Sequence, residues 1–171
     1  ANFASILIDG QDDLGWTPIH LAAYLGDIDA VNILLDNKAD TSIGQILPIE
    51  LAGSEGHTEV VKLLFDYSYP SRESREEALF KSSENGHLEI VEALVNSGVP
   101  VDVRNDKEKT PLHLAVWEGN YTIAVFLLDQ GADVNAVDRY GNSPMSTVET
   151  WYRKNNQPLY ELIHAWHNKS K

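Results

Sequence analysis

A helical hairpin that recurs in register is the feature that most limits how this chain can fold. Thr110 can cap a helix and Pro111 can open it, because the first turn leaves backbone donors unpaired and proline has none to lose. Gly119 follows where a left-handed residue would end that helix. A second helix then carries an apolar stripe, formed by Ile123, Ala124, Leu127 and Leu128. One hairpin cannot bury its own stripe, so it needs copies on either side.

Such copies are present along most of the chain. The helix-opening position recurs at steps of about 30 to 33 residues, the length of a helix-pair repeat, at Pro18, Pro48, Ala78, Pro111 and Pro144. A glycine follows each of the first four openings, at Gly26, Gly56, Gly86 and Gly119. The array predicts an all-α solenoid of stacked helix-turn-helix units, joined by short turn or β-hairpin fingers.

Two openings, Thr17-Pro18-Ile19-His20-Leu21-Ala22-Ala23 and Thr110-Pro111-Leu112-His113-Leu114-Ala115, resemble ankyrin repeats. The segment 131–135 resembles the closing part of the same repeat, and the likeness extends from about Gly15 to Trp166. It implies an L-shaped stack with projecting fingers and a concave binding face. It also implies that His20 and His113 are structural, holding the turn to the first helix by hydrogen bonds.

The resulting prediction is a single ankyrin-repeat domain over residues 1–171. Residues 1–14 are expected to form the N-terminal cap and first finger, followed by repeats near 15–42, 43–72, 73–105, 106–138 and 139–168.

Three departures from the repeat are visible. The fingers after the first and second repeats are shorter than the later ones, which would leave a notch in the finger row. The third repeat lacks the opening motif: either its charged lead extends the helix backward from a cap at Ser71, or it is a drifted repeat held by its neighbours. The fifth is a lengthened closing repeat, with one helix running from Pro144 toward Arg153 and another starting at Pro158.

Composition limits the partner. Lys plus Arg number 13 against 26 Asp plus Glu, a net charge of −13, which argues against nucleic acid and anionic membranes. The charge would steer a basic protein surface toward the chain, or it serves solubility alone. Cysteine is absent and no apolar run reaches the roughly 20 residues of a membrane span. The chain begins at Ala1, from trimming or signal-peptide removal, and we expect an exported or periplasmic chain rather than a cytoplasmic one.

The sequence offers no catalytic constellation. Phosphate-loop strings are missing, and the His164 and His167 pair lacks an acidic third ligand nearby. We therefore expect no enzyme activity, no cofactor and no metal site.

Large side chains at variable positions of the repeat indicate a protein-binding surface more strongly than any residues indicate catalysis, because exposed aromatic side chains make binding hot spots. Tyr24 and Trp117 share one repeat position that the family turns toward the concave face; packing between neighbouring first helices is the alternative for both. The predicted partner-binding residues, an aromatic floor with a charged rim, are Asp12, Asp13, Trp16, Tyr24, Glu84, Asp106, Glu108, Trp117, Glu118, Val137, Arg139, Tyr140 and Trp151.

These features predict a non-catalytic protein-binding module that inhibits or shields a partner, for example an enzyme such as a cell-wall hydrolase in the same compartment. The alternatives are an adaptor or secreted effector scaffold and, with no supporting constellation, an enzyme or small-ligand receptor. The expected partner is a folded protein with a basic or mixed basic and apolar surface, rather than nucleic acid or a membrane. We expect the chain to be monomeric on its own.

Overall fold

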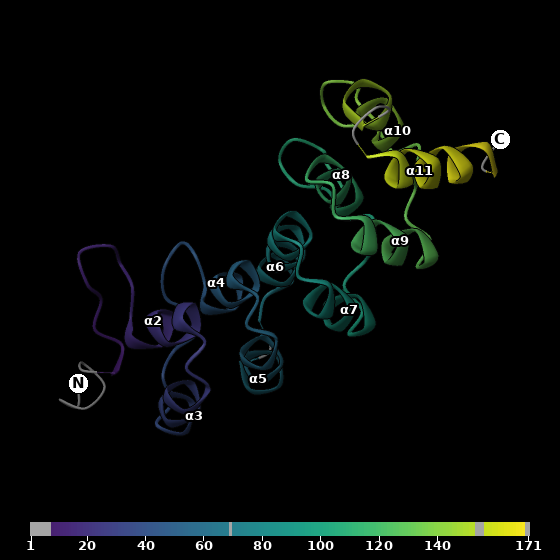
Figure 1. The fold of residues 1–171 in the computed structure, drawn as a ribbon. Helices are drawn as coiled ribbons and strands as arrows, with labels where there is room; N and C mark the ends of the chain where they lie inside the picture. Colours follow the sequence, from purple (N-terminus) through teal and green to yellow (C-terminus); the bar gives the residue numbers. More distant parts are fainter. Residues whose placement is uncertain (1–7, 69, 153–155, 170–171) are drawn as a thin grey trace. The chain divides into compact units, whose positions relative to one another are not determined.

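The computed structural model describes residues 8–68, 70–152 and 156–169, and every regular element in them is a helix (Figure 1). These are α2 Pro18–Leu25, α3 Ile28–Asp36, α4 Pro48–Glu55, α5 Thr58–Ser68, α6 Arg72–Asn85, α7 Leu88–Asn96, α8 Pro111–Trp117, α9 Tyr121–Asp129, α10 Pro144–Thr147, the π-helix η1 Val148–Tyr152, and α11 Gln157–Lys169. The predicted all-α repeat fold is confirmed. The fingers in these residues are turns, with no strand assigned.

The threonine, proline and histidine of the opening motif close the start of α2 and α8 in the same way. The Thr17 amide donates to Nδ1 of His20 at 3.1 Å, and the Thr17 hydroxyl lies 2.7 Å from the same atom. Because Nδ1 accepts, Nε2 carries the proton and donates to the Ile46 carbonyl at 2.9 Å. Each histidine thus ties its own helix to the next finger, and the predicted structural role is confirmed.

His113 repeats this arrangement, with Nδ1 held by Thr110 and Nε2 lying 3.2 Å from the carbonyl of Asn142. Burial lowers the pKa of both His20 and His113, although the carbonyl bonds act in the opposite direction. Both rings are therefore kept in the neutral form that their hydrogen bonds require.

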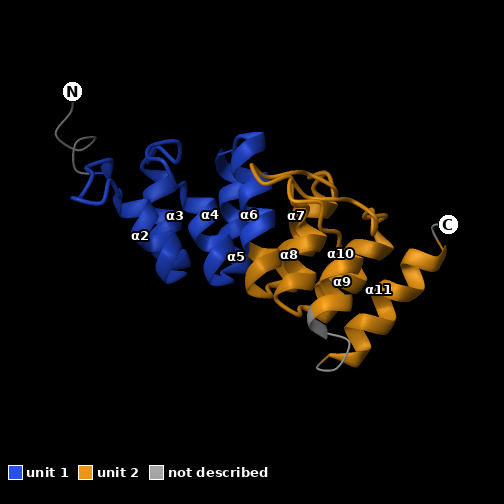
Figure 2. Ribbon diagram, turned by 90° about the horizontal axis from the view of Figure 1, so that it is seen from above, with its two compact units in different colours: residues 1–81 blue, residues 82–171 orange. Residues whose placement is uncertain are grey.

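The chain contacts group into two compact units, residues 1–81 and 82–171, with the boundary inside α6 (Figure 2). In the first unit α2 packs on α4 and α3 packs on α5, so first and second helices form two layers. The stripes between these layers are fully buried, as at Ile19, Val31 and Leu64, which are 0%, 0% and 1% exposed.

In the second unit α8 packs on α10, while α9 contacts both α7 and α11. The stripe of α9 is buried as the sequence predicts, at Ile123, Ala124, Leu127 and Leu128. On α11, Leu159 and Ile163 are also buried. The predicted single domain and its repeat boundaries stay predictions.

Loops between the helices of a pair are also linked from repeat to repeat. Gly26 has φ 71°, and a Cβ there would lie 2.5 Å from the ring of His57, so glycine is required twice over. The His57 ring bonds the Tyr24 carbonyl at 3.0 Å. In the second unit Asn120 makes the equivalent link. Its side-chain amide donates to the carbonyls of Ser83 and Glu84 at 2.9 Å each.

The third and fifth repeats depart from the regular pattern at the residues where their sequences depart from it. Ser71 accepts from the Ser74 amide at 3.2 Å, and α6 begins at Arg72, so the third repeat has the backward-extended helix with its predicted cap. In the fifth repeat the first helix changes from α10 to the π-helical η1 at Val148. The expected course of that helix toward Arg153 runs beyond the described residues, and residues 1–7 of the predicted N-terminal cap also lie outside them.

Candidate functional site

Three fingers are built on one turn, in which a side-chain oxygen accepts two backbone amides, two and four residues further on. The oxygens belong to Asp12, Asn105 and Asp138, and the acceptor distances lie between 2.8 and 3.0 Å. Burial would raise the pKa of Asp138, but hydrogen bonds from Asn142 and Tyr140 hold it below its ordinary value. Asp12, predicted to bind a partner, therefore has a first role in shaping its own finger.

The two fingers of the second unit are joined to each other by arginines. Nη1 of Arg104 donates to the Glu108 carbonyl at 2.9 Å and to the Val137 carbonyl at 2.7 Å. From the other finger, Nη2 of Arg139 donates to the Asp106 carbonyl, and its amide donates to the Lys107 carbonyl at 3.0 Å. The fingers therefore present one cross-linked surface, on which Val137 is 51% and Tyr140 68% exposed.

Trp117 lies at the end of α8, and its side chain is 49% exposed. Nζ of Lys109, at the base of the first of these fingers, lies 5.2 Å from the centre of the indole ring. This cation–π contact orients the ring while leaving half of the residue accessible. The alternative for Trp117 is full packing between neighbouring helices, which would bury its side chain. A residue that is half exposed does not fit that alternative.

The first unit has its own aromatic group. The rings of Trp16 and Tyr24 lie 5.4 Å apart, and Trp16 also stacks on the His20 ring at 6.5 Å. Tyr24 remains 40% exposed. Trp16 is partly covered by this stacking and is less free than its predicted place at the base of a finger implied.

The predicted binding residues fall into two sets. Asp12, Asp13, Trp16 and Tyr24 belong to the first unit, and Glu84, Asp106, Glu108, Trp117, Glu118, Val137, Arg139 and Tyr140 belong to the second. A hydrogen bond from the Arg139 side chain to the Asp106 carbonyl brings those two residues together, and ring contact brings Trp16 and Tyr24 together. Glu118 caps the end of α8 and is exposed. The side chain of Trp151 lies outside the described part of the structure.

Sequence reasoning missed Glu50, which takes the place of the histidine in the second repeat's opening, Leu47-Pro48-Ile49-Glu50. Burial raises its pKa to about 7, helped by the charge of Glu77 and opposed by the Leu47 backbone and Lys81. The sequence signal that could have pointed to Glu50 is an acid at the position where the repeat's opening motif has histidine. Glu50 lines a depression at the shortened finger after the first repeat, together with Glu73 and Glu77.

Replacing Glu50 with glutamine tests how much its buried charge lowers the stability of the folded protein. Since folding raises the pKa of Glu50 from 4.5 to about 7, its stabilising effect is complete below pH 4.5 and is lost as pH rises through 7. Glu50→Gln should therefore raise the melting temperature at pH 8 by about 2–4 °C, for a gain on the order of 1 kcal/mol after discounting partial exposure. At pH 4.5 the two proteins should melt alike.

Thermal unfolding at both pH values checks this, with Asp66→Asn as the control, since Asp66 is an exposed carboxylate on the neighbouring α5. The two buried histidines destabilise the folded protein as the pH falls below 6.5. This effect is the same with Glu50 and with glutamine, so it cancels when the two melting temperatures are compared. An equal gain at both pH values would show that Glu50 is not protonated by folding.

Among the described residues no group of three or more His, Cys, Asp or Glu could hold a metal ion, and no helix is long and apolar enough to cross a membrane. His164 and His167, the pair weighed as ligands, contact Asn168 at 2.9 Å and Asn135 at 2.6 Å.

Paired helices with cross-linked fingers and exposed aromatic side chains define a repeat protein of the protein-binding class. The family model for ankyrin repeats in three copies matches residues 49–138, and that for a single ankyrin repeat matches residues 14–44. The chain belongs to the ankyrin-repeat family, whose domains are generally non-catalytic protein-interaction modules.

Curated relatives match over shorter stretches. The chain is 36% identical over 70 residues to potassium channel KOR2 of Oryza sativa subsp. japonica, covering 41% of this chain and 9% of the channel. It is 38% identical over 63 residues to serine/threonine-protein kinase VIK of Arabidopsis thaliana, covering 37% of this chain and 14% of the kinase. It is 40% identical over 50 residues to the human ankyrin repeat domain-containing protein 53, covering 27% of this chain and 9% of that protein. The matched part is thus a small fraction of each relative.

Proposed function

We propose that this chain is a non-catalytic inhibitor or protector that grips another folded protein and blocks it. The observation that carries the proposal is the surface of the second unit, where two bonded fingers present Tyr140 and Val137 and Trp117 stands half exposed beside Lys109. Tyrosine and tryptophan held in place lose little entropy when they become buried, so they suit a hot spot.

Charge supports a protein partner with basic or mixed basic and apolar character. The chain carries twice as many acidic as basic residues, 26 against 13, which would speed the approach of a cationic surface. The fingers themselves are mixed, because Arg104, Lys107, Lys109 and Arg139 lie among Asp106 and Glu108. A partner that meets them would therefore carry both signs around an apolar projection.

Inhibition is the sharper form of the proposal, since a binding module acts by occupying its target. An enzyme with an open cleft, such as a cell-wall hydrolase in the same exported or periplasmic compartment, is the kind of target we propose. The second candidate is an adaptor or secreted effector scaffold, favoured by the separate aromatic group of Trp16 and Tyr24, which gives the first unit a surface of its own.

The deciding experiment captures the partner on the immobilised chain from an extract of the source organism, then purifies it and measures its activity. We expect a one-to-one complex in solution and loss of the partner's activity at stoichiometric amounts of the chain. A stoichiometric complex whose partner stays fully active would favour the adaptor. Failure to bind any protein, together with turnover or stabilisation by a metabolite, would overturn both.

A further inference from the structure

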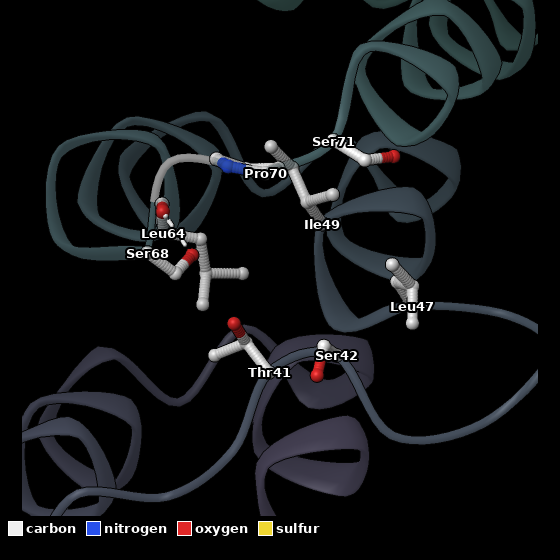
Figure 3. A pocket seen from close by; sticks show the side chains of 8 residues that line it. All are labelled: Thr41, Ser42, Leu47, Ile49, Leu64, Ser68, Pro70 and Ser71. Carbon is white, nitrogen blue, oxygen red and sulfur yellow. Dashed lines mark hydrogen bonds between the residues drawn. The ribbon is translucent and has the colours of Figure 1, made fainter.

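Two hollows in residues 1–81 meet at the shortened finger after the first repeat, and neither belongs to the finger surface described above. The first is a pocket of about 100 Å³ (Figure 3). Its lining comes from the loop before α4, from α4 and α5, and from the segment before α6: Thr41, Ser42, Leu47, Ile49, Leu64, Ser68, Pro70 and Ser71. The side chains in Figure 3 surround a central space, and Leu64 points into it.

The pocket offers apolar walls, because most of its hydroxyls already have partners. Ser68 donates to the Leu64 carbonyl at 2.6 Å, Ser42 donates to Asp40 at 2.6 Å, and Ser71 lies 3.0 Å from the Ser74 hydroxyl. Since an apolar cavity of about 150 Å³ accepts benzene, this smaller one suits a branched aliphatic side chain better than an aromatic ring.

The second hollow is a wider, open depression that shares Ser42 and Leu47 with the pocket. It continues to three carboxylates, Glu50, Glu73 and Glu77. Among the described residues the lining itself holds no basic residue, although Nζ of Lys81 lies 4.0 Å from Glu77 and the charges of Arg72 and Arg75 act on Glu73 from outside it. The surface that lines the depression beside the apolar pocket is therefore acidic.

The departures of the repeat explain why this place is open. At the first and fourth openings a histidine reaches the carbonyl of the next finger, at Ile46 and Asn142. Glu50 replaces that histidine, and the extended α6 replaces the finger it would reach. An ionised carboxylate cannot donate to a carbonyl as histidine does, and burial raises the pKa of Glu50 to about 7. A cation supplied from outside would favour the ionised form and so suits this position.

We propose that the two hollows form one docking site for an extended segment of a partner protein, in which a branched aliphatic side chain enters the pocket and a neighbouring lysine or arginine reaches the carboxylates. Charge complementarity selects this occupant: in the described part of the chain the depression is lined by three carboxylates and no basic residue, whereas the fingers of the second unit carry charges of both signs. The inference rests on the proposed function and names a second contact for the same kind of partner.

The test uses the full ¹⁵N-labelled chain and a capped peptide, acetyl-Gly-Leu-Arg-Leu-Lys-Gly-amide, followed by NMR. We expect saturable amide shifts centred on Ser42, Leu47 and Ser71, with a dissociation constant near the millimolar range, about 4 kcal/mol of binding. Peptides with serine in place of leucine, or glutamine in place of both cations, should bind at least about fivefold more weakly. Shifts centred elsewhere, or equal binding of all three peptides, would overturn the proposal.

Variants separate the pocket from general charge. Glu50→Gln with Glu77→Gln should weaken peptide binding about tenfold, as loss of one charged contact does, and Thr41→Phe should fill the pocket and have a similar effect. Asp29→Asn with Asp66→Asn likewise replaces two carboxylates by amides, at exposed positions of α3 and α5, and should change affinity less than about twofold. Equal weakening by both double variants would reduce the binding to unspecific attraction and overturn the site.

The amide spectrum and the melting temperature show whether each variant folds. If Glu50→Gln with Glu77→Gln alters stability, Thr41→Phe still tests the pocket independently. Trp117→Ala should leave peptide binding unchanged. A captured partner that depends on Trp117 while the peptide does not bind would therefore remove this docking site and leave the proposed function standing.

Discussion

Replacing Leu127 with alanine should lower the free energy of unfolding by about 2–5 kcal/mol, the largest stability effect expected in this chain. Leu127 is 0% exposed on α9, the helix that contacts both α7 and α11. In a repeat protein each helix pair is stabilised mainly by its neighbours, so a cavity at this position weakens two interfaces at once. Urea unfolding followed by circular dichroism measures the change.

The matched comparison is Trp117→Ala in the same repeat. Trp117 is the larger side chain, yet it is 49% exposed, so its loss should cost less than about 1 kcal/mol. Leu127→Ala should also lower the melting temperature by about 2–4 °C for each kcal/mol lost. Comparable destabilisation by the two substitutions would contradict the separation of a buried stripe from an exposed binding surface.

The helices could be predicted because their signals are local. Thr17 and Thr110 cap, proline opens, Gly26 ends a helix at positive φ, and the stripe of α9 follows the helical period. Ser71 was predictable as a cap for the same reason, since its partner is the amide of Ser74, three residues away.

The surface chemistry depends on longer-range contacts that spacing does not encode. Arg104 and Arg139 could reach many acceptors, and only the fold shows that they join two fingers through backbone carbonyls in neighbouring repeats. The covering of Trp16 by Tyr24 depends on two side-chain conformations, not on repeat position. The shortened finger predicted a notch, whereas its apolar and acidic lining came from α4, α5 and α6, which only folding brings together.

Trp117→Ala should weaken the complex with the captured partner by about 2 kcal/mol or more, an increase in dissociation constant of roughly 30-fold. The physical reason is that the ring is already oriented by Lys109, so burying its remaining surface costs little entropy and removes a large apolar area from water. Isothermal titration calorimetry with the purified partner measures the change, and most of it should come from faster dissociation.

Tyr121→Ala is the matched control, because Tyr121 is 41% exposed but begins α9, in the layer of second helices. Its affinity should stay within about twofold of the unsubstituted chain. Lys109→Gln removes the cation over the ring and should weaken binding less than Trp117→Ala does, since a partly exposed cation–π contact contributes about 0.5–1 kcal/mol. If Tyr121→Ala weakens the complex and Trp117→Ala does not, the partner grips the second helices, and the binding surface must be reassigned from the fingers to α9 and its neighbours.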